Sequence, residues 1–139
     1  EIPKRDWSSD VCSSDLQVAT VWDFQRFIGE GCVDVIQPDL SRCGGISVAK
    51  KVAEMAVEAG IDLVPHSWLT HLLTGYSLQL IATLPRARFV EFNVSQSALT
   101  AGIAKASFAL QPDGTVPIPD TPGIGVEVDE DFVRRHRAN

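Results

Sequence analysis

Short apolar runs alternate along this chain with longer segments in which apolar residues recur every three or four positions. A short apolar run is typical of a buried strand, whereas the longer period is that of a helix with one buried face. The pattern predicts strands at 33–37, 61–64 and 88–92, and helices at about 20–28, 47–59 and 71–84. Because strands and helices alternate with short links, we predict an α/β fold of parallel strands joined by right-handed crossovers.

Residues that favour helix ends mark two of these helices. Thr20 is expected to cap the first helix and Ser47 the second, and Gly60 is a typical stop for the second. No phosphate-binding glycine motif surrounds Gly44 and Gly45, so we interpret both as the turn into the second helix.

The pattern changes in the last third of the chain. Residues 95–106 are small and polar, which predicts a loop or a weak helix. The runs 108–110 and 115–118 flank an Asp113-Gly114 pair and predict a β-hairpin. A stretch rich in proline and glycine follows, and the last residues predict a short helix. A hairpin and loop extension is therefore expected after the last strand.

The first 16 residues follow neither period. They contain Ser-Ser-Asp twice, and the string KRDWSSDVCSSDL resembles the translation of a sequencing-library adapter. We therefore expect residues 1–16 to be a non-native leader and residues 17–139 to form the domain. A genuine disordered tail is the alternative.

Composition and charge narrow the class of protein. The chain has 45% hydrophobic and 22% charged residues, as ordinary globular proteins do. Its net charge is −6 and it has no basic stripe, so we expect no nucleic acid partner. No run of about 18 apolar residues indicates a membrane span, so no membrane partner is expected. Cys32 and Cys43 lack the spacing of a metal motif, and free thiols favour a reducing cytoplasm.

Three polar residues stand at or just beyond the ends of the predicted strands: Asp39, His66 and Glu91. They are separated by 27 and 25 residues, about the length of one strand and its crossover helix. In a barrel of such units, side chains at the C-terminal strand ends meet at one mouth. The sequence therefore predicts an acid/base site. A strand-end histidine with satisfied hydrogen bonds, beside two solvated carboxylates, is the alternative.

Each residue of this site has a predicted role. An imidazole ordinarily titrates near neutrality, which suits His66 for taking a proton from carbon. Asp39 could hydrogen-bond one ring nitrogen of His66 and fix its tautomer. Glu91, if protonated, could donate a proton or a hydrogen bond to a developing enolate. Trp68 is predicted to bind substrate as a wall of the pocket, and packing on the barrel rim is the alternative.

Other reactive side chains are not expected to take part. His71 should lie on its helix and His136 in the tail, both of them solvated. Cys43 stands near the predicted mouth, but no base is evident beside it, so a nucleophilic role is not expected.

Four segments carry a resemblance to a known family: IQPDLSRCGGI (36–46), VPHSW (64–68), FVEFN (89–93) and DGTVPIPDTPGIGVEVD (113–129). In this order they resemble the C-terminal barrel half of the enolase superfamily. The most similar group is the mandelate racemase/muconate lactonizing enzyme family, with its acid-sugar dehydratases and cycloisomerases. The resemblance implies a partial TIM-type (β/α) barrel, roughly strands six to eight with flanking helices, and a separate N-terminal capping domain.

The resemblance also implies an activity. Asp39 and His66 match the Asp–His dyad of the family, with His66 as acid/base, and Glu91 matches an acid that hydrogen-bonds the substrate carboxylate. The implied reaction removes the proton α to the carboxylate of a sugar acid, and dehydratases then expel water. Racemases and cycloisomerases of the family share the first step, and a catalytically inert barrel fragment is a further alternative.

A magnesium ion is implied as the cofactor. The family's carboxylate ligands lie at the ends of strands three to five and would precede Gln17, so no metal ligand is assigned within this chain. We therefore expect a truncated, by itself inactive part of a magnesium-dependent lyase or isomerase. Its implied partner is a small carboxylate or sugar acid, and the full-length protein is expected to be a homo-oligomer.

Overall fold

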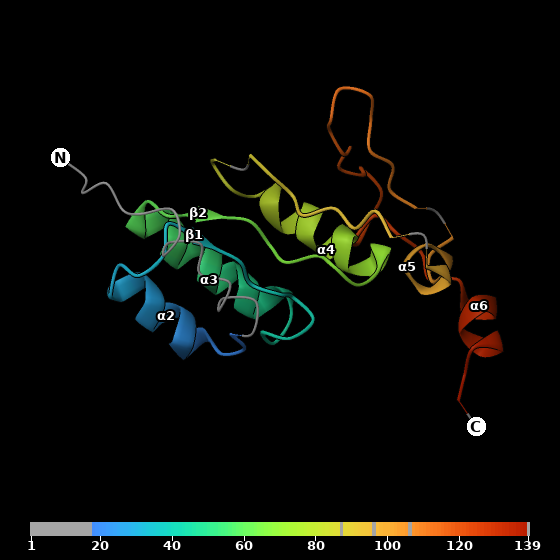
Figure 1. The fold of residues 1–139 in the computed structure, drawn as a ribbon, viewed down its shortest axis with the longest axis horizontal. Coiled ribbons are helices and arrows are strands. Elements are labelled where there is room, and N and C mark those ends of the chain that lie inside the picture. The colour runs from blue at the N-terminus through green and yellow to red at the C-terminus, as the bar shows by residue number, and fades with distance from the viewer. Residues whose placement is uncertain (1–17, 87, 96, 106, 139) are drawn as a thin grey trace.

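The computed structural model describes residues 18–86, 88–95, 97–105 and 107–138. The predicted leader, residues 1–16, lies outside the described residues, so that division of the chain stays a prediction. The elements in chain order are α2 (Val21–Gly29), β1 (Val35–Ile36), α3 (Ile46–Ala59), β2 (Asp62–Leu63), α4 (His71–Ile81), α5 (Ala98–Gly102) and α6 (Glu130–Arg135). In Figure 1, α2 and α3 lie side by side beneath the two strands, and α5 and α6 lie at the opposite end of the molecule.

The two strands are parallel neighbours and α3 is the crossover between them, as predicted. Their register pairs Val35 with Asp62, and the pairing continues beyond the assigned strands. The N–H of His66 donates to the carbonyl of Pro38 at 3.1 Å, and Asp39 and His66 form an isolated parallel bridge. The backbone ladder therefore extends to the two residues of the predicted dyad.

The predicted third strand, 88–92, is not a strand in the described part of the chain. In a parallel ladder alternate residues donate to opposite neighbours, so residues 65 and 67 would donate away from β1. Pro65 has no N–H, and the N–H of Ser67 donates to the side chain of Glu91 instead of a backbone carbonyl. Side-chain contacts thus replace the expected ladder here.

Most helix ends agree with the sequence. Thr20 caps α2 and accepts a hydrogen bond from the N–H of Asp23 at 3.3 Å, and Gly60 ends α3 with φ 72°. The prediction that Ser47 caps α3 is wrong, because the cap is Gly45 and Ser47 lies inside the first turn. The φ of 86° at Gly45 is readily available only to glycine, and it turns the chain directly into the helix.

The main core lies between the inner face of α3, the strands and α2. Phe24, Ile36 and Val52 are fully buried in it. Leu73 and Leu80 of α4 belong to the same cluster. Of the residues described, none belongs to a helix long and apolar enough to cross a bilayer.

The C-terminal extension has the predicted turn without the predicted strands. Gly114 has a φ of 82°, and its N–H donates to the carbonyl of Gln111 at 2.9 Å. The N–H of Gln111 in turn donates to the carbonyl of Thr115 at 2.8 Å. No strand is assigned on either side of this turn in residues 107–138. Pro117 and Pro119 have no N–H to continue a ladder, which explains why the hairpin goes no further.

A close approach of α5 and α6 predicts the effect of one substitution. A Cβ atom on Gly102 would lie 2.8 Å from Cδ2 of Phe132 and closer still to Cε2. We expect Gly102→Ala to lower the free energy of unfolding by about 1–3 kcal/mol, because the buried ring must move. Gly29→Ala is the matched control, since a Cβ there meets nothing within 4 Å and the free energy should stay equal or rise. Denaturant unfolding measures both, and equal effects would contradict this packing.

Candidate active site

The C-terminal ends of the two strands bring Asp39 and His66 together. Pro38 and Pro65 immediately precede them and are fully buried, which holds both backbones at this edge. Nδ1 of His66 lies 2.8 Å from Oδ2 of Asp39. The predicted pairing of these two residues is therefore present in the structure.

Asp39 is a buried carboxylate that accepts several hydrogen bonds. Its side chain is 1% exposed, and Oδ1 accepts from the N–H and the hydroxyl of Ser41 at 2.7 and 2.5 Å. Burial by itself would raise the pKa of Asp39, but the hydrogen bonds from Ser41 and His66 outweigh it and hold the pKa below its ordinary value. Arg42 adds a positive charge 3.5 Å from Oδ2. Asp39 is thus ionised at neutral pH.

The ionised state of Asp39 decides the tautomer of His66. A carboxylate only accepts hydrogen bonds, so we assign the ring proton of neutral His66 to Nδ1. The lone pair then lies on Nε2, which is 3.9 Å from Oε2 of Glu91. An imidazole in this state can take a proton at Nε2 while the carboxylate stabilises the resulting positive charge.

Glu91 completes the group from the segment that follows α4. Its Oε2 accepts a hydrogen bond from the N–H of Ser67 at 2.6 Å, and its side chain is 29% exposed. This oxygen therefore acts as an acceptor. The predicted donor role of Glu91 stays a prediction for its other oxygen, and the structure brings all three predicted residues together.

Trp68 lies on the loop directly after this site. Its residue is 52% exposed, so the ring is accessible to a ligand from solvent. Its backbone carbonyl accepts a hydrogen bond from Asn93 at 3.0 Å. Both the substrate-binding role and packing on the barrel rim stay predictions for this side chain.

Three residues of the site were missed by the sequence analysis: Ser41, Ser67 and Asn93. A serine two residues after an aspartate commonly donates back to it, so Ser41 had a local signal. Ser67 bonds to Glu91, 24 residues away, and Asn93 bonds to Trp68, 25 residues away. No local sequence pattern predicts contacts at such separations.

The sequence of the chain also matches a known protein family. The family model described as "Enolase C-terminal domain-like" matches residues 13–132. The chain belongs to the enolase superfamily.

Two characterised relatives of this superfamily member act on acid sugars or their lactones, according to their names. The D-galactarolactone cycloisomerase of Agrobacterium fabrum is 31% identical over 118 residues, which cover 79% of this chain and 31% of the relative. The D-galactonate dehydratase of Ralstonia pickettii is 35% identical, covering 81% of this chain and 31% of the relative. The matched part thus spans about a third of these relatives' length.

Solved structures of the superfamily share the fold. The 3,6-anhydro-D-galactonate cycloisomerase of Zobellia galactanivorans superposes with a TM-score of 0.77 at 32% identity, covering 85% of this chain and 33% of its own. A proposed L-alanine-DL-glutamate epimerase of Burkholderia xenovorans, crystallised with magnesium and fumarate, gives 0.75 at 26% identity, covering 86% and 29%. The predicted partial TIM-type barrel is confirmed.

A magnesium site does not fit the residues that the structure describes in this superfamily member. Within the described ranges, no group of three or more His, Cys, Asp or Glu side chains could hold a metal ion. Both oxygens of Asp39 are already hydrogen-bonded, and Ser67 occupies one oxygen of Glu91. Asp39 and Glu91 therefore serve His66 and the adjoining loop rather than a cation.

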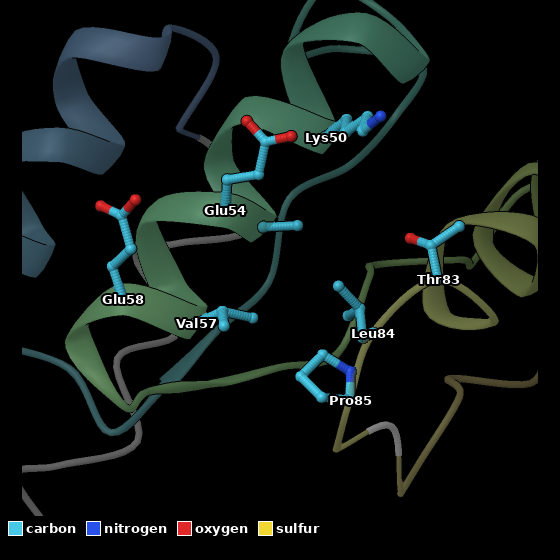
Figure 2. Close-up of a pocket in the computed structure, with 8 residues that line it drawn as sticks. Lys50, Glu54, Val57, Glu58, Thr83, Leu84 and Pro85 are labelled. Atoms are coloured by element: carbon cyan, nitrogen blue, oxygen red, sulfur yellow. The ribbon is translucent and has the colours of Figure 1, made fainter.

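Two surface grooves lie near the helices. One has a volume of about 400 Å³ and lies between Lys50, Glu54 and Glu58 on α3 and the segment 83–85 after α4. Figure 2 shows the side chains that line it. None of the three strand-end residues lines it. A second groove of about 410 Å³ reaches Ser41 but is lined mainly by apolar side chains. Neither carries the acid/base chemistry described above.

The cysteines of the described residues differ in their exposure, and the prediction that Cys43 is not a nucleophile stays a prediction. Cys32 and Cys43 are free thiols, the first exposed and the second buried. Burial, and then the negative charge of Asp39, raises the pKa of Cys43. The thiol is therefore protonated at neutral pH and a poor nucleophile.

His71 contradicts the prediction that it is solvated. It is 6% exposed, and its ring stacks on that of Phe108 and meets that of Phe92 edge-on, with centroid distances of 5.9 and 6.0 Å. Its Nδ1 accepts a hydrogen bond from the N–H of Phe108 at 2.8 Å. His136 is exposed, as predicted, and stacks on Phe132. Aromatic residues distant in sequence buried His71, which a helix pattern alone cannot reveal.

The burial of His71 predicts a pH dependence of stability. Burial lowers the pKa of His71 below 6.5, so the unfolded chain binds a proton at a higher pH than the folded chain does. The free energy of unfolding is therefore expected to fall as the pH drops from about 6.5 toward the folded pKa. Thermal unfolding at pH 7.5 and 5.5 measures this.

His71→Phe is the test variant for this pH effect. It should lose stability at pH 7.5, by about 1–3 kcal/mol, because the N–H of Phe108 loses its acceptor. It should also show a smaller drop in melting temperature between the two pH values. An unchanged drop would contradict the role of His71, and the exposed His136→Phe serves as the control.

Proposed function

We propose that this chain is part of a sugar-acid dehydratase, which removes the proton α to a carboxylate and then eliminates water. One observation carries the proposal: the 2.8 Å contact between Asp39 and His66, which leaves Nε2 basic. The 35% identity to a D-galactonate dehydratase supports the substrate class. The relative with bound magnesium supports a magnesium-dependent whole enzyme, with metal ligands outside the residues described.

Each of the four predicted site residues has a distinct role in this reaction. Nε2 of His66 takes the α-proton. The electrons of the broken C–H bond form the C=C bond of an enolate, between the α-carbon and the carboxylate carbon. Asp39 stabilises the imidazolium, because its negative charge lies 2.8 Å from Nδ1. The enolate electrons then form a Cα=Cβ bond as the β C–O bond breaks, and the imidazolium returns its proton to the leaving hydroxide as water. The resulting enol tautomerises to the 2-keto-3-deoxy acid. Glu91, when protonated on its other oxygen, donates a hydrogen bond to the substrate carboxylate or the growing enolate. Trp68 forms one wall of the pocket.

A cycloisomerase is the second candidate. The relatives from Agrobacterium fabrum and Zobellia galactanivorans are named as cycloisomerases and match this chain nearly as well. Both reactions begin with the same proton abstraction, and so does racemisation. The difference lies in what happens at the β-carbon, so only product analysis separates them.

The test uses the full-length protein with Mg²⁺ and a panel of aldonates, aldarates and their lactones in D₂O. We expect deuterium at the α-carbon of at least one substrate, a 2-keto-3-deoxy acid as product, and loss of both when EDTA removes the metal. A ring-opened product without loss of water would favour the cycloisomerase. Absence of exchange with every acid sugar would contradict the proposal and favour an inert barrel protein.

Location and assembly belong to the same proposal. We expect the enzyme in the cytoplasm and as a homo-oligomer, with a small carboxylate or sugar acid as its partner and with neither nucleic acid nor membrane. Light scattering of the full-length protein measures the assembly state directly.

A further inference from the structure

Asn93 joins the two segments that carry His66 and Glu91. Its residue is 4% exposed. The side-chain nitrogen donates to the carbonyls of Trp68 and Leu69, at 3.0 and 3.3 Å. The side-chain oxygen accepts from the N–H of Ser95 at 2.8 Å. One buried amide therefore connects the loop after β2 with the segment 88–95.

These contacts lie where the expected backbone ladder is missing. Ser67 donates to Glu91 at 2.6 Å, and two residues after Glu91 the side chain of Asn93 donates back to the two loop residues that follow Ser67. Thr100 of α5 donates its hydroxyl to Leu69 at 3.3 Å, so this carbonyl has two donors. The loop and the segment are thus tied by side chains at both ends of the 67–69 stretch.

We propose that Asn93 is a positioning residue, which holds the loop against residues 88–93 and thereby sets the 3.9 Å separation of His66 and Glu91. The inference rests on the proposed function for its catalytic consequence. Two carbonyl oxygens accept from Asn93, and an amide supplies two N–H groups on one nitrogen. An aspartate has the same shape but would direct a negative oxygen at both carbonyls.

The test compares two variants of the full-length protein, Asn93→Ala and Asn93→Asp, with Gln79→Ala and Gln79→Glu as controls. Gln79 makes the same kind of bond, from a half-buried side-chain amide to the carbonyl of Pro119 at 3.1 Å, away from the site. We expect kcat for α-proton exchange to fall about 10- to 100-fold in the Asn93 variants, because small misplacements of reacting groups are costly. The Gln79 variants should keep the wild-type kcat.

A second readout does not depend on catalysis. Amide hydrogen exchange at Ser67 should accelerate about 10-fold or more in the Asn93 variants and stay unchanged in the Gln79 variants. If the Asn93 variants do not fold, Thr100→Val removes the other donor to Leu69 and should change both readouts in the same direction, about 2- to 5-fold.

The outcomes separate the two proposals. Wild-type Ser67 exchange in the Asn93 variants, or fast Ser67 exchange with wild-type kcat, overturns the positioning role. If the wild-type protein exchanges no α-proton with any acid sugar, the proposed function fails. The rate of amide hydrogen exchange at Ser67 then still shows whether Asn93 holds the loop.

Discussion

Replacing His66 with asparagine is expected to lower the rate of α-proton exchange by about 10²- to 10⁴-fold, the usual contribution of a general base. Nδ1 of His66 is 2.8 Å from Asp39, and an asparagine side chain can still donate to that carboxylate. The fold should therefore survive while the basic Nε2 is lost. Deuterium incorporation from D₂O into the substrate, followed by NMR, measures the rate in the full-length protein.

The control is the same substitution at the exposed tail histidine, His136→Asn. It removes an imidazole far along the chain from the strand ends and should leave the exchange rate unchanged. If His66→Asn retains the wild-type rate while its melting temperature is also unchanged, His66 is not the base and the proposed mechanism is wrong.

Asp39→Asn is expected to lower kcat by about 10²- to 10⁴-fold, although the base itself is still present. Neutral asparagine can accept from or donate to Nδ1 of His66, so the ring is no longer held with its lone pair on Nε2. The positive charge that forms on the ring also loses the carboxylate that lies 2.8 Å away. The pH dependence of kcat and kcat/KM in the full-length protein measures this effect.

The same variant should change acid stability. The pKa of Asp39 is lowered from 3.8 in the folded chain, so ionised Asp39 stabilises the fold above that pH. This stabilisation is lost as the pH falls through the folded pKa. Asp39→Asn should therefore unfold more easily at pH 7 and lose less stability on acidification than the wild type.

Asp34→Asn is the matched control, because Asp34 is exposed near the start of β1. It should change neither kcat nor the acid unfolding profile. A wild-type kcat in Asp39→Asn, with His66 still required, would show that the dyad does not set the tautomer.

Elements that depend on nearby residues could be predicted from the amino-acid pattern alone. The period of the apolar residues located α2, α3 and α4, and Thr20 and Gly60 marked helix ends correctly, because capping involves only a few neighbouring residues. The spacing of Asp39 and His66 predicted their approach. A parallel crossover of that length leaves little freedom in where the next strand ends.

Contacts between segments distant along the chain could not be predicted in this way and became visible only in the folded chain. These contacts bury His71 against Phe92 and Phe108, replace the third ladder by the bond from Ser67 to Glu91, and bond Asn93 to the carbonyl of Trp68. Such contacts depend on which side chains face each other after packing, and each partner is compatible locally with several environments. Hydrogen bonds between separated segments form only once the core has packed, because packing determines which polar groups lie within reach of each other. Local backbone preference does not determine them.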